Sequence, residues 1–458
     1  MNESNKNRRD FFQAVGQAGA GLAAAAVSSR DARAAAGPQE GSMAGFRASA
    51  LPVVRAAFIG VGARGSGHVR QMMTLQGVEI VAICDNHPPS LQRSVANVVK
   101  SGRKEPAAFG NGDTDYKRML ERKDIDIVII ATPWEWHATM CVDAMESGKH
   151  AFTEVPAALS VEECWKLVKV SEKTRKYCMM MENCCYGQEE LMCLNMCRQG
   201  VFGDLLHAEG SYIHDLRSQM QEVEHGTGSW RTLHYARRNG NLYPTHGLGP
   251  VAQYLGINRG DRFDYLSAVA SPALGRPLYA KKKYPPDHKW NKISVWNCGD
   301  MVTTLIKTAK GRSLMVQWDE TSPRPYSRLN LIQGTKGTFA GYPPRLAVEE
   351  LTPNTHAWVS GEQLKPFQEK YEHPLWKKMG ELAQSGGGHG GMDWLMLWRM
   401  VYCLRNGEPL DQDVYDAAAW SAVGPLSEQS IARRSTSMDI PDFTGGMWKN
   451  VKPLGIVT

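Results

Sequence analysis

Two features are scarce in this sequence: long apolar stretches and clustered basic charge. Beyond its N-terminal segment, the chain has no run of about 18 consecutive apolar residues, the length that a membrane-spanning helix needs. The formal net charge is only +6 over 458 residues, and lysine and arginine form no stripe that could follow a phosphate backbone. We therefore expect neither stable membrane insertion nor nucleic-acid binding.

Cysteine is present, but the spacings that zinc sites require are missing. None of the ten cysteines belongs to a repeated C-x-x-C pair. Most lie inside apolar strand or helix patterns, and two are adjacent in the chain: Cys84, Cys141, Cys164, Cys178, Cys184, Cys185, Cys193 and Cys197. We expect mostly buried thiols and no metal site.

The N-terminus has the pattern of a targeting segment. Arg8 and Arg9 are followed by two phenylalanines, a weakly apolar run over 14–27, and three alanines at 34–36 that offer an A-x-A cleavage site. This pattern predicts a twin-arginine signal peptide over residues 1–36, a linker over 37–54, and a periplasmic or secreted mature protein. The alternative is a disordered basic tail.

Residues 55–186 alternate between strand and helix patterns. Strands are predicted over 56–59, 78–84, 125–131, 150–154 and 178–182, and helices over 68–76, 136–147 and 160–176. Ser160 and Glu163 form a capping box at the start of the last helix. Strands separated by helices predict a doubly wound parallel sheet of the Rossmann type.

Residues 187–458 show a different pattern. Strands are predicted over 205–212, 262–270, 301–308, 313–318, 328–333 and 337–340, and short turns join several of them, so the sheet should be mostly antiparallel. Residues 343–372 read as irregular. A glycine run at 386–391, before a helix over 392–404, is either a flexible loop or a loop over an active site. The fold class is therefore α/β, in two domains, with C-terminal helices returning toward the first.

A phosphate-binding fingerprint follows the first strand. Gly60, Gly62 and Gly65 form G-x-G-x-x-G between a strand and a helix, where glycines let a pyrophosphate approach the helix N-terminus. Asp85 ends the second strand and can accept hydrogen bonds from ribose hydroxyls. Because an acidic residue there repels a 2′-phosphate, the cofactor should be NAD rather than NADP.

Polar residues also end the later strands of this domain. Thr132-Pro133-Trp134-Glu135-Trp136-His137, Glu154-Val155-Pro156 and Glu182-Asn183 each follow a predicted strand. Strand carboxyl ends line the cofactor crevice in such sheets. Together with the fingerprint, these turns resemble the glucose–fructose oxidoreductase and inositol dehydrogenase superfamily, whose second domain carries an open, mostly antiparallel sheet.

Two departures from that superfamily stand out. The superfamily usually has a Glu-Lys-Pro turn, and this chain has Val155 in place of the lysine. Its dehydrogenases often have an aspartate four residues before a catalytic histidine, and this chain has Leu242 four residues before His246. Both departures, with Trp230-Arg231 and Asn241-Leu242-Tyr243-Pro244-Thr245-His246-Gly247, resemble the NAD-dependent α-N-acetylgalactosaminidases of glycoside hydrolase family 109.

The resemblance implies two groups of site residues. Those that would contact NAD are Arg64, Gly65, Asp85, Trp134, Glu135, Trp136, His137, Glu154, Val155 and Asn183. Those that would surround the sugar and the nicotinamide are Tyr212, Arg231, Tyr243, His246 and Tyr326.

The acidic residues fit this family's redox route better than ordinary glycoside hydrolysis. No pair of carboxylates with a recognisable signature is present, although ordinary glycosidases need one on each side of the bond. The resemblance implies instead oxidation at C3 by NAD, elimination, water addition and reduction, which returns NAD at each turn. His246 and Tyr243 are plausible proton-transfer groups, Arg231 could hold a sugar oxygen, and His137 more readily positions a ligand.

The first hypothesis is thus a retaining glycosidase that keeps NAD bound and releases terminal α-linked N-acetylgalactosamine from glycans. An exported NAD(P)-dependent sugar oxidoreductase and a non-catalytic NAD- or sugar-binding protein are the alternatives. Twin-arginine export carries folded proteins, which suits a protein that takes up NAD before it leaves the cytoplasm. The chain could also form a homo-oligomer.

Overall fold

The computed structural model describes residues 41–453, 455 and 456. The predicted signal peptide and the first four residues of the predicted linker lie outside this range. The described residues from Met43 onward form one compact unit. No described helix is both long and apolar enough to cross a membrane.

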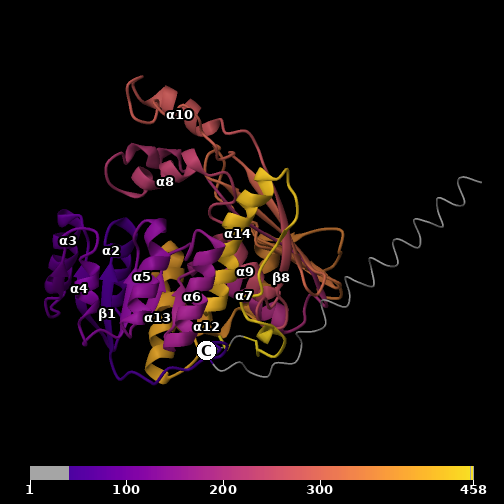
Figure 1. The fold of residues 1–458 in the computed structure, drawn as a ribbon. Helices are drawn as coiled ribbons and strands as arrows, with labels where there is room; N and C mark the ends of the chain where they lie inside the picture. The colour runs from indigo at the N-terminus through magenta and orange to yellow at the C-terminus, as the bar shows by residue number, and fades with distance from the viewer. Residues whose placement is uncertain (1–40, 454, 457–458) are drawn as a thin grey trace, which may run out of the picture. The chain divides into compact units, whose positions relative to one another are not determined.

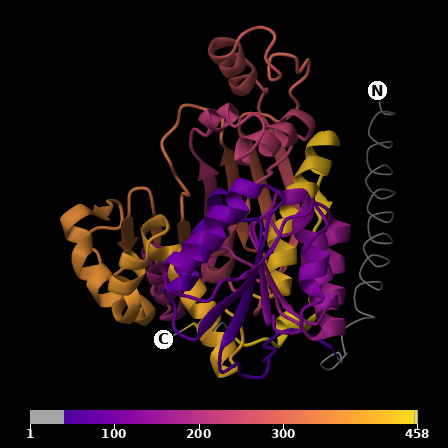
Figure 2. The ribbon, with the colours of Figure 1, turned by 90° about the vertical axis from the view of Figure 1, so that its left-hand side faces the viewer.

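The first sheet confirms the predicted parallel arrangement. Its described strands follow the order β3-β2-β1-β4-β5-β6, and each neighbouring pair is parallel. The bounds are Val54–Ile59 for β1, Val78–Cys84 for β2, Ala107–Phe109 for β3, Ile127–Ile130 for β4, His150–Thr153 for β5 and Cys178–Met180 for β6. Residues of β4 and β5 are buried throughout, as expected for strands covered on both faces. Figure 2 shows these strands between helices on two sides.

Five helices accompany this sheet in the described chain. They are α2 (Ala63–Met73), α3 (Pro88–Lys100), α4 (Tyr116–Leu120), α5 (Trp134–Glu146) and α6 (Val161–Thr174). The predicted capping box is present, with Ser160 and Glu163 each accepting from the other's backbone. The first helix was predicted to begin at residue 68, five residues after α2 begins. The prediction was late because the glycines near the start of α2 have low intrinsic helix propensity. It assigned no element over 85–124 and so missed α3 as well as β3 and α4, of which only β3 and α4 are too short to show a period.

The second sheet is mixed but mostly antiparallel, as predicted. Its described strands follow the order β14-β13-β12-β11-β7-β10-β9-β8-β15, and only the β7–β10 pair is parallel. The bounds are Leu205–Ile213 for β7, Phe263–Ala270 for β8, Val302–Thr308 for β9, Ser313–Asp319 for β10, Leu331–Gly334 for β11, Gly337–Ala340 for β12, Arg345–Val348 for β13, Val359–Ser360 for β14 and Met438–Asp439 for β15.

Two predictions about this region were wrong. Residues 343–372 are not irregular, since they hold β13, β14, the 3-10 helix η3 (Gly361–Leu364) and helix α11 (Lys365–Tyr371). Strands of four and two residues are too short to reveal an alternating pattern. The strand predicted to begin at residue 328 begins at Leu331, because Leu329 and Asn330 take positive φ angles.

Seven more α-helices complete the described chain, and some of them pack between the two sheets. Their bounds are Gln188–Arg198 for α7, Thr227–Arg237 for α8, Thr245–Tyr254 for α9, Gly275–Lys283 for α10, Pro374–Gly386 for α12, Met392–Asn406 for α13 and Val414–Ala432 for α14. Helix α13 contacts α2, while α14 contacts α6 and β6 of the first sheet and β8 of the second. Figure 1 shows α13 and α14, drawn in orange and yellow, beside the magenta helices of the first sheet. Most residues of α14 are buried, so this helix belongs to both cores.

Candidate active site

A cavity of about 1050 Å³ lies where loops after the strands of the first sheet meet β7, α8 and α9 of the second part. Ligand pockets typically measure about 300–1,000 Å³, so this cavity is large enough for a dinucleotide with a sugar beside it. The predicted site residues that line it are Gly60, Gly62, Arg64, Asp85, Trp134, Trp136, His137, Glu154, Val155, Asn183, Tyr212, Arg231, Tyr243 and His246. The glycine run also lines it, through Gly386, Gly387, Gly388 and His389.

Three predicted residues lie behind or beside the lining. A Cβ at Gly65 would overlap the carbonyl oxygen of Gly60, so this glycine serves the close packing of α2 on its loop. The Glu135 carboxylate lies 3.3 Å from His234 Nε2, on α8. The Tyr326 ring lies 6.2 Å from that of Tyr212, which itself lines the cavity.

The glycine loop has the geometry of a dinucleotide cradle. Gly60 has φ +80°, and a Cβ there would come within 2.7 Å of a backbone oxygen after β4, whereas a Cβ at Gly62 would meet open space. The Asp85 carboxylate accepts hydrogen bonds from the backbone N–H groups of Val61 (2.6 Å) and His87 (2.8 Å). Each carboxylate oxygen of Asp85 therefore holds one loop, the glycine loop or the loop after β2. Each oxygen also keeps a lone pair that can accept a hydrogen bond from a ribose hydroxyl. These residues fit NAD.

Arg64 is held by two carboxylates rather than pointing freely into the cavity. Its Nε lies 2.7 Å from Glu154, and its NH1 lies 2.6 Å from Asp393. Glu154 also accepts from His68 at 2.6 Å. Burial alone would raise the pKa of Glu154, but the charge of Arg64 and the His68 hydrogen bond bring the pKa far below its usual value.

His137 is a clamp between strand ends. Its ring nitrogens lie 2.7 Å from the carbonyl oxygen of Pro156 and 2.8 Å from that of Thr132. The side chain is buried, and this burial lowers its pKa. Each ring nitrogen faces a backbone carbonyl oxygen, and a neutral imidazole donates to one of them at a time. His137 therefore shapes the loops after β4 and β5.

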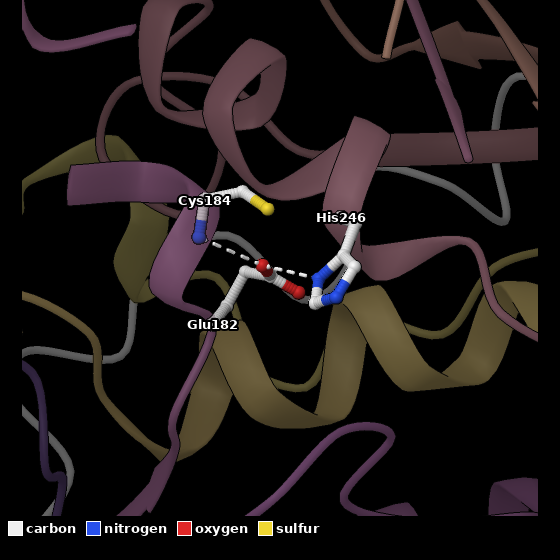
Figure 3. A group of neighbouring side chains, drawn as sticks. All are labelled: Glu182, Cys184 and His246. Carbon is white, nitrogen blue, oxygen red and sulfur yellow. Dashed lines mark hydrogen bonds and ion pairs between the residues drawn. The ribbon is translucent and has the colours of Figure 1, made fainter. Parts of the chain in front are cut away.

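His246, by contrast, has one nitrogen directed at a carboxylate and one at a hydroxyl. Its Nδ1 lies 2.7 Å from Glu182 Oε1, and its Nε2 lies 3.4 Å from the Tyr243 hydroxyl. Figure 3 shows the Glu182 contact. An ionised carboxylate can only accept, so Nδ1 carries the hydrogen and Nε2 accepts from Tyr243. Burial raises the pKa of Tyr243, which keeps its hydroxyl protonated.

Sequence reasoning placed Glu182 at the end of a predicted strand but gave it no role, and it did not single out Asp393 at all. The resemblance noted from the sequence led us to look for an aspartate four residues before His246, where this chain has Leu242. The carboxylate comes instead from the loop after β6, 64 positions away in the sequence. Its side chain is fully buried. Burial raises the pKa of Glu182, but the charge of His246 and its hydrogen bond outweigh burial and lower it. The available signal was an acidic residue at the end of a predicted parallel strand.

The same cluster also contains potential metal ligands. Ligand atoms of Glu182, Cys184 and His246 lie within 4.8 Å of one another. However, the carboxylate and the imidazole already bond to each other, and burial raises the pKa of Cys184 well above its usual value. A protonated thiol is a poor ligand, because metals bind the thiolate. The geometry thus favours a hydrogen-bonded acid–imidazole pair.

Aromatic rings surround the remaining part of the cavity. The Arg231 guanidinium lies 4.9 Å from the Trp134 ring centre, 5.5 Å from that of Trp230 and 5.1 Å from that of Tyr243. Its NH1 lies 3.4 Å from the buried carboxylate of Glu320. Burial opposes the charge of Arg231, but nearby phenols and Glu320 raise its pKa further, so it stays a cation. A fixed cation among aromatic faces is suited to a polyhydroxylated ring.

Comparisons with known proteins agree with this architecture. Residues 54–182 match the oxidoreductase family model for an NAD-binding Rossmann fold, and residues 186–450 match the C-terminal domain of glycosyl hydrolase 109. The chain is 58% identical over 458 residues to "Glycosyl hydrolase family 109 protein 1" of Shewanella sp. (strain ANA-3) and to "Alpha-N-acetylgalactosaminidase" of Shewanella oneidensis, each alignment covering 99% of both chains.

Solved structures show the same fold at much lower identity. Levoglucosan dehydrogenase in complex with NADH and levoglucosan aligns with a TM-score of 0.64 and 18% identity, covering 85% of this chain and 100% of its own. An oxidoreductase domain protein from Kribbella flavida aligns with a TM-score of 0.65 and 16% identity, covering 86% and 100%. Such identities establish the fold alone. The family is shown by the full-length relatives and the domain match: this chain belongs to glycosyl hydrolase family 109.

Proposed function

We propose that this protein hydrolyses terminal α-linked N-acetylgalactosamine from glycans, with retention, and that NAD stays bound and is regenerated at each turnover. One observation carries the proposal. The proton-handling group Glu182–His246–Tyr243 borders the cavity that also contains the dinucleotide fingerprint. The name of the Shewanella oneidensis relative supports the choice of sugar.

The carboxylates of the cavity argue against ordinary glycoside hydrolysis. Four acidic side chains line it, and all four are already bonded: Asp85 to backbone N–H groups, Asp113 to Asn86, Glu154 to Arg64, and Asp393 to Arg64. The carboxylate nearest to His246, that of Glu182, is itself bonded to the imidazole. An ordinary glycosidase needs a free acid and a second carboxylate about the glycosidic bond. The described residues therefore favour the redox route.

When bound, NAD would take a hydride from C3 of the sugar and later return it, and the C3 ketone in between makes the C2 hydrogen acidic enough for elimination. The chain's own residues handle the protons. The lone pair of His246 Nε2 receives a proton that the sugar releases through the Tyr243 hydroxyl. Glu182 stabilises the imidazolium that results, because its charge lies on the far side of the ring.

Arg231 and its neighbours would orient the sugar. The Arg231 side chain is 11% exposed and lines the cavity, so its guanidinium can donate to a sugar oxygen. The Tyr212 ring centre lies 4.8 Å from that of Tyr243 and 4.9 Å from that of His246, which makes an apolar wall beside the proton path.

The decisive assay uses purified protein and an aryl α-N-acetylgalactosaminide with no added NAD. Release of the aryl group without accumulation of NADH supports the proposal, and the sugar product formed in deuterated water should carry deuterium at C2. Stoichiometric NADH with an intact glycoside would instead establish a sugar oxidoreductase, whose fold this chain shares. Absence of both would favour a non-catalytic NAD- or sugar-binding protein.

We also propose export of the folded protein by the twin-arginine route, on the strength of Arg8, Arg9 and the segment that follows them. Replacing both arginines by lysine should leave the protein in the cytoplasm in a cell fractionation experiment. Unchanged periplasmic or secreted protein would contradict this proposal.

A further inference from the structure

We propose that the segment Gly386–Asp393 is part of the cofactor site and retains the dinucleotide by fastening itself to α2 through the Asp393–Arg64 ion pair. The segment comprises the end of α12, the 3-10 turn η4 (His389–Gly391) and the start of α13. This inference rests on the proposed function, in which NAD stays bound. It assigns the retention to residues that lie more than 320 positions from the glycine loop.

The segment is tied to α2 at two points, and the residue after the segment makes a third tie just beyond the end of α2. Asp393 binds Arg64 with both oxygens, at 2.6 and 3.3 Å. The Gln71 side chain donates to the carbonyl oxygen of Gly387 at 2.8 Å. The Trp394 indole donates to Thr74 at 2.8 Å, one residue beyond the C-terminal end of α2. These ties hold the segment along the helix whose N-terminus would bind the pyrophosphate.

The glycines of the segment allow its backbone to take one particular conformation. Gly387, Gly388, Gly390 and Gly391 all have positive φ angles, between 71° and 101°. A Cβ at Gly388 would overlap the Gln71 amide and lie 2.6 Å from an Asp393 oxygen. Only glycine lets the backbone pass this close to both anchors. The backbone is thus shaped to reach α2.

Asp393 is the centre of the fastening. Its side chain is 3% exposed, and besides Arg64 it accepts from Asn183 at 2.5 Å and from His389 at 2.8 Å. Burial would raise the pKa of Asp393, but the His389 hydrogen bond and the charge of Arg64 bring the pKa far below its usual value. The carboxylate is therefore charged at every working pH. It joins α2 and the loop after β6 to the segment.

The location explains why this fastening would control NAD release. Gly386, Gly387, Gly388, His389 and Asp393 line the same cavity as Gly60, Gly62 and Arg64. They form one wall of the cavity, although they lie outside residues 54–182, which form the Rossmann-type sheet. A dinucleotide bound at the glycine loop is enclosed on this side only while the three ties hold. Breaking the strongest tie should therefore act on the rate of release.

The test measures bound NAD in the full-length protein. Wild type and Asp393→Asn are purified without added NAD, the NAD content is determined after denaturation, and the release rate is followed with an enzymatic trap for free NAD. Asp393→Asn should release NAD at least tenfold faster. The milder Gln71→Ala removes only the tie to Gly387 and should accelerate release by a smaller factor, which keeps the test informative if Asp393→Asn folds poorly.

Asp411→Asn is the matched control. Asp411 binds Arg399 of α13 with both oxygens at 2.9 and 2.7 Å, is equally buried, and does not line the cavity. It should lower the stability and leave NAD release unchanged. Equal release from wild type and Asp393→Asn, or equal acceleration by Asp411→Asn, would overturn the inference. With saturating NAD, Asp393→Asn should regain aryl glycoside hydrolysis. If wild type binds NAD but hydrolyses nothing, only the proposed function fails.

Discussion

Replacing Glu182 by Gln isolates the charge behind His246. The amide has the size of the carboxylate, and its oxygen can still accept from Nδ1 at the 2.7 Å position. What it cannot do is offset the positive charge that appears on the ring when Nε2 takes up a proton. The variant therefore leaves the hydrogen-bond pattern in place and removes the electrostatic support.

The structure sets the size of the effect. Two unit charges about 4 Å apart interact by about 4 kcal/mol at the effective dielectric constant of 20 that suits protein sites. A hydrogen bond to a charged group contributes about 1.5–3 kcal/mol net. The ring bears only part of its charge in a proton-transfer transition state, so we expect a loss of about 1.5–3 kcal/mol, or roughly 10- to 150-fold in kcat/KM.

The assay is hydrolysis of an aryl α-N-acetylgalactosaminide across pH, with bound NAD measured in parallel. The Glu182→Gln variant should show the lower kcat/KM at every pH at which wild type is active. Bound NAD should not change. A variant with the wild-type rate would refute the role of Glu182, as would a loss explained entirely by lost NAD.

The remaining predictions concern the neighbouring groups and the stability. Cys184→Ala, and treatment with a chelator, should leave activity within about twofold of wild type if the cluster handles protons; a large loss in both would indicate a bound metal. Arg231→Lys should lower kcat/KM roughly tenfold, mainly through KM, because an ammonium cannot stack between Trp134 and Tyr243; a change in kcat alone would contradict this. Burial lowers the pKa of His150 and of His373 to about 4, so the unfolded chain binds more protons than the native one as the pH falls below 6.5. Each histidine should thus cost stability on the order of 3 kcal/mol by pH 4, and urea midpoints for His150→Asn should fall less steeply with acid than those of wild type.

The sequence patterns predicted the helices and strands that have a clear hydrophobic pattern or a capping motif. Residues 127–130 are four buried aliphatic side chains between polar turns, and such a run has few interpretations beside a covered parallel strand. The capping box at Ser160 fixed a helix start to the residue. Short elements escaped, because β14 has two residues and β3 three. Their formation depends on partners far away in the chain, which no local period reveals.

The candidate site was predicted where local motifs carry it and missed where pairing is long-range. The glycine loop, Asp85 and the Tyr243–His246 spacing are readable in the sequence because each lies within one loop or one turn. The partners of these residues come from elsewhere: Glu182 for His246, and Asp393 for Arg64. A single sequence gives no sign that two such distant positions lie in contact in the fold. The interpretation of the glycine run likewise stayed open until its position along α2 was known.

Helix α14 has a consequence for how the protein is made. It is among the last elements in the chain, yet it packs on α6 and β6, whose residues precede it by about 240 positions, as well as on β8. During synthesis the N-terminal residues emerge first. Both sheets must therefore wait, with apolar surface uncovered, until the helix that they share has left the ribosome. The Asp393–Arg64 contact, too, can form only after residue 393 has emerged, so one wall of the cavity is completed late in synthesis. Under the proposed function, in which NAD stays bound, this order leaves an interval in which NAD can enter before that wall is complete.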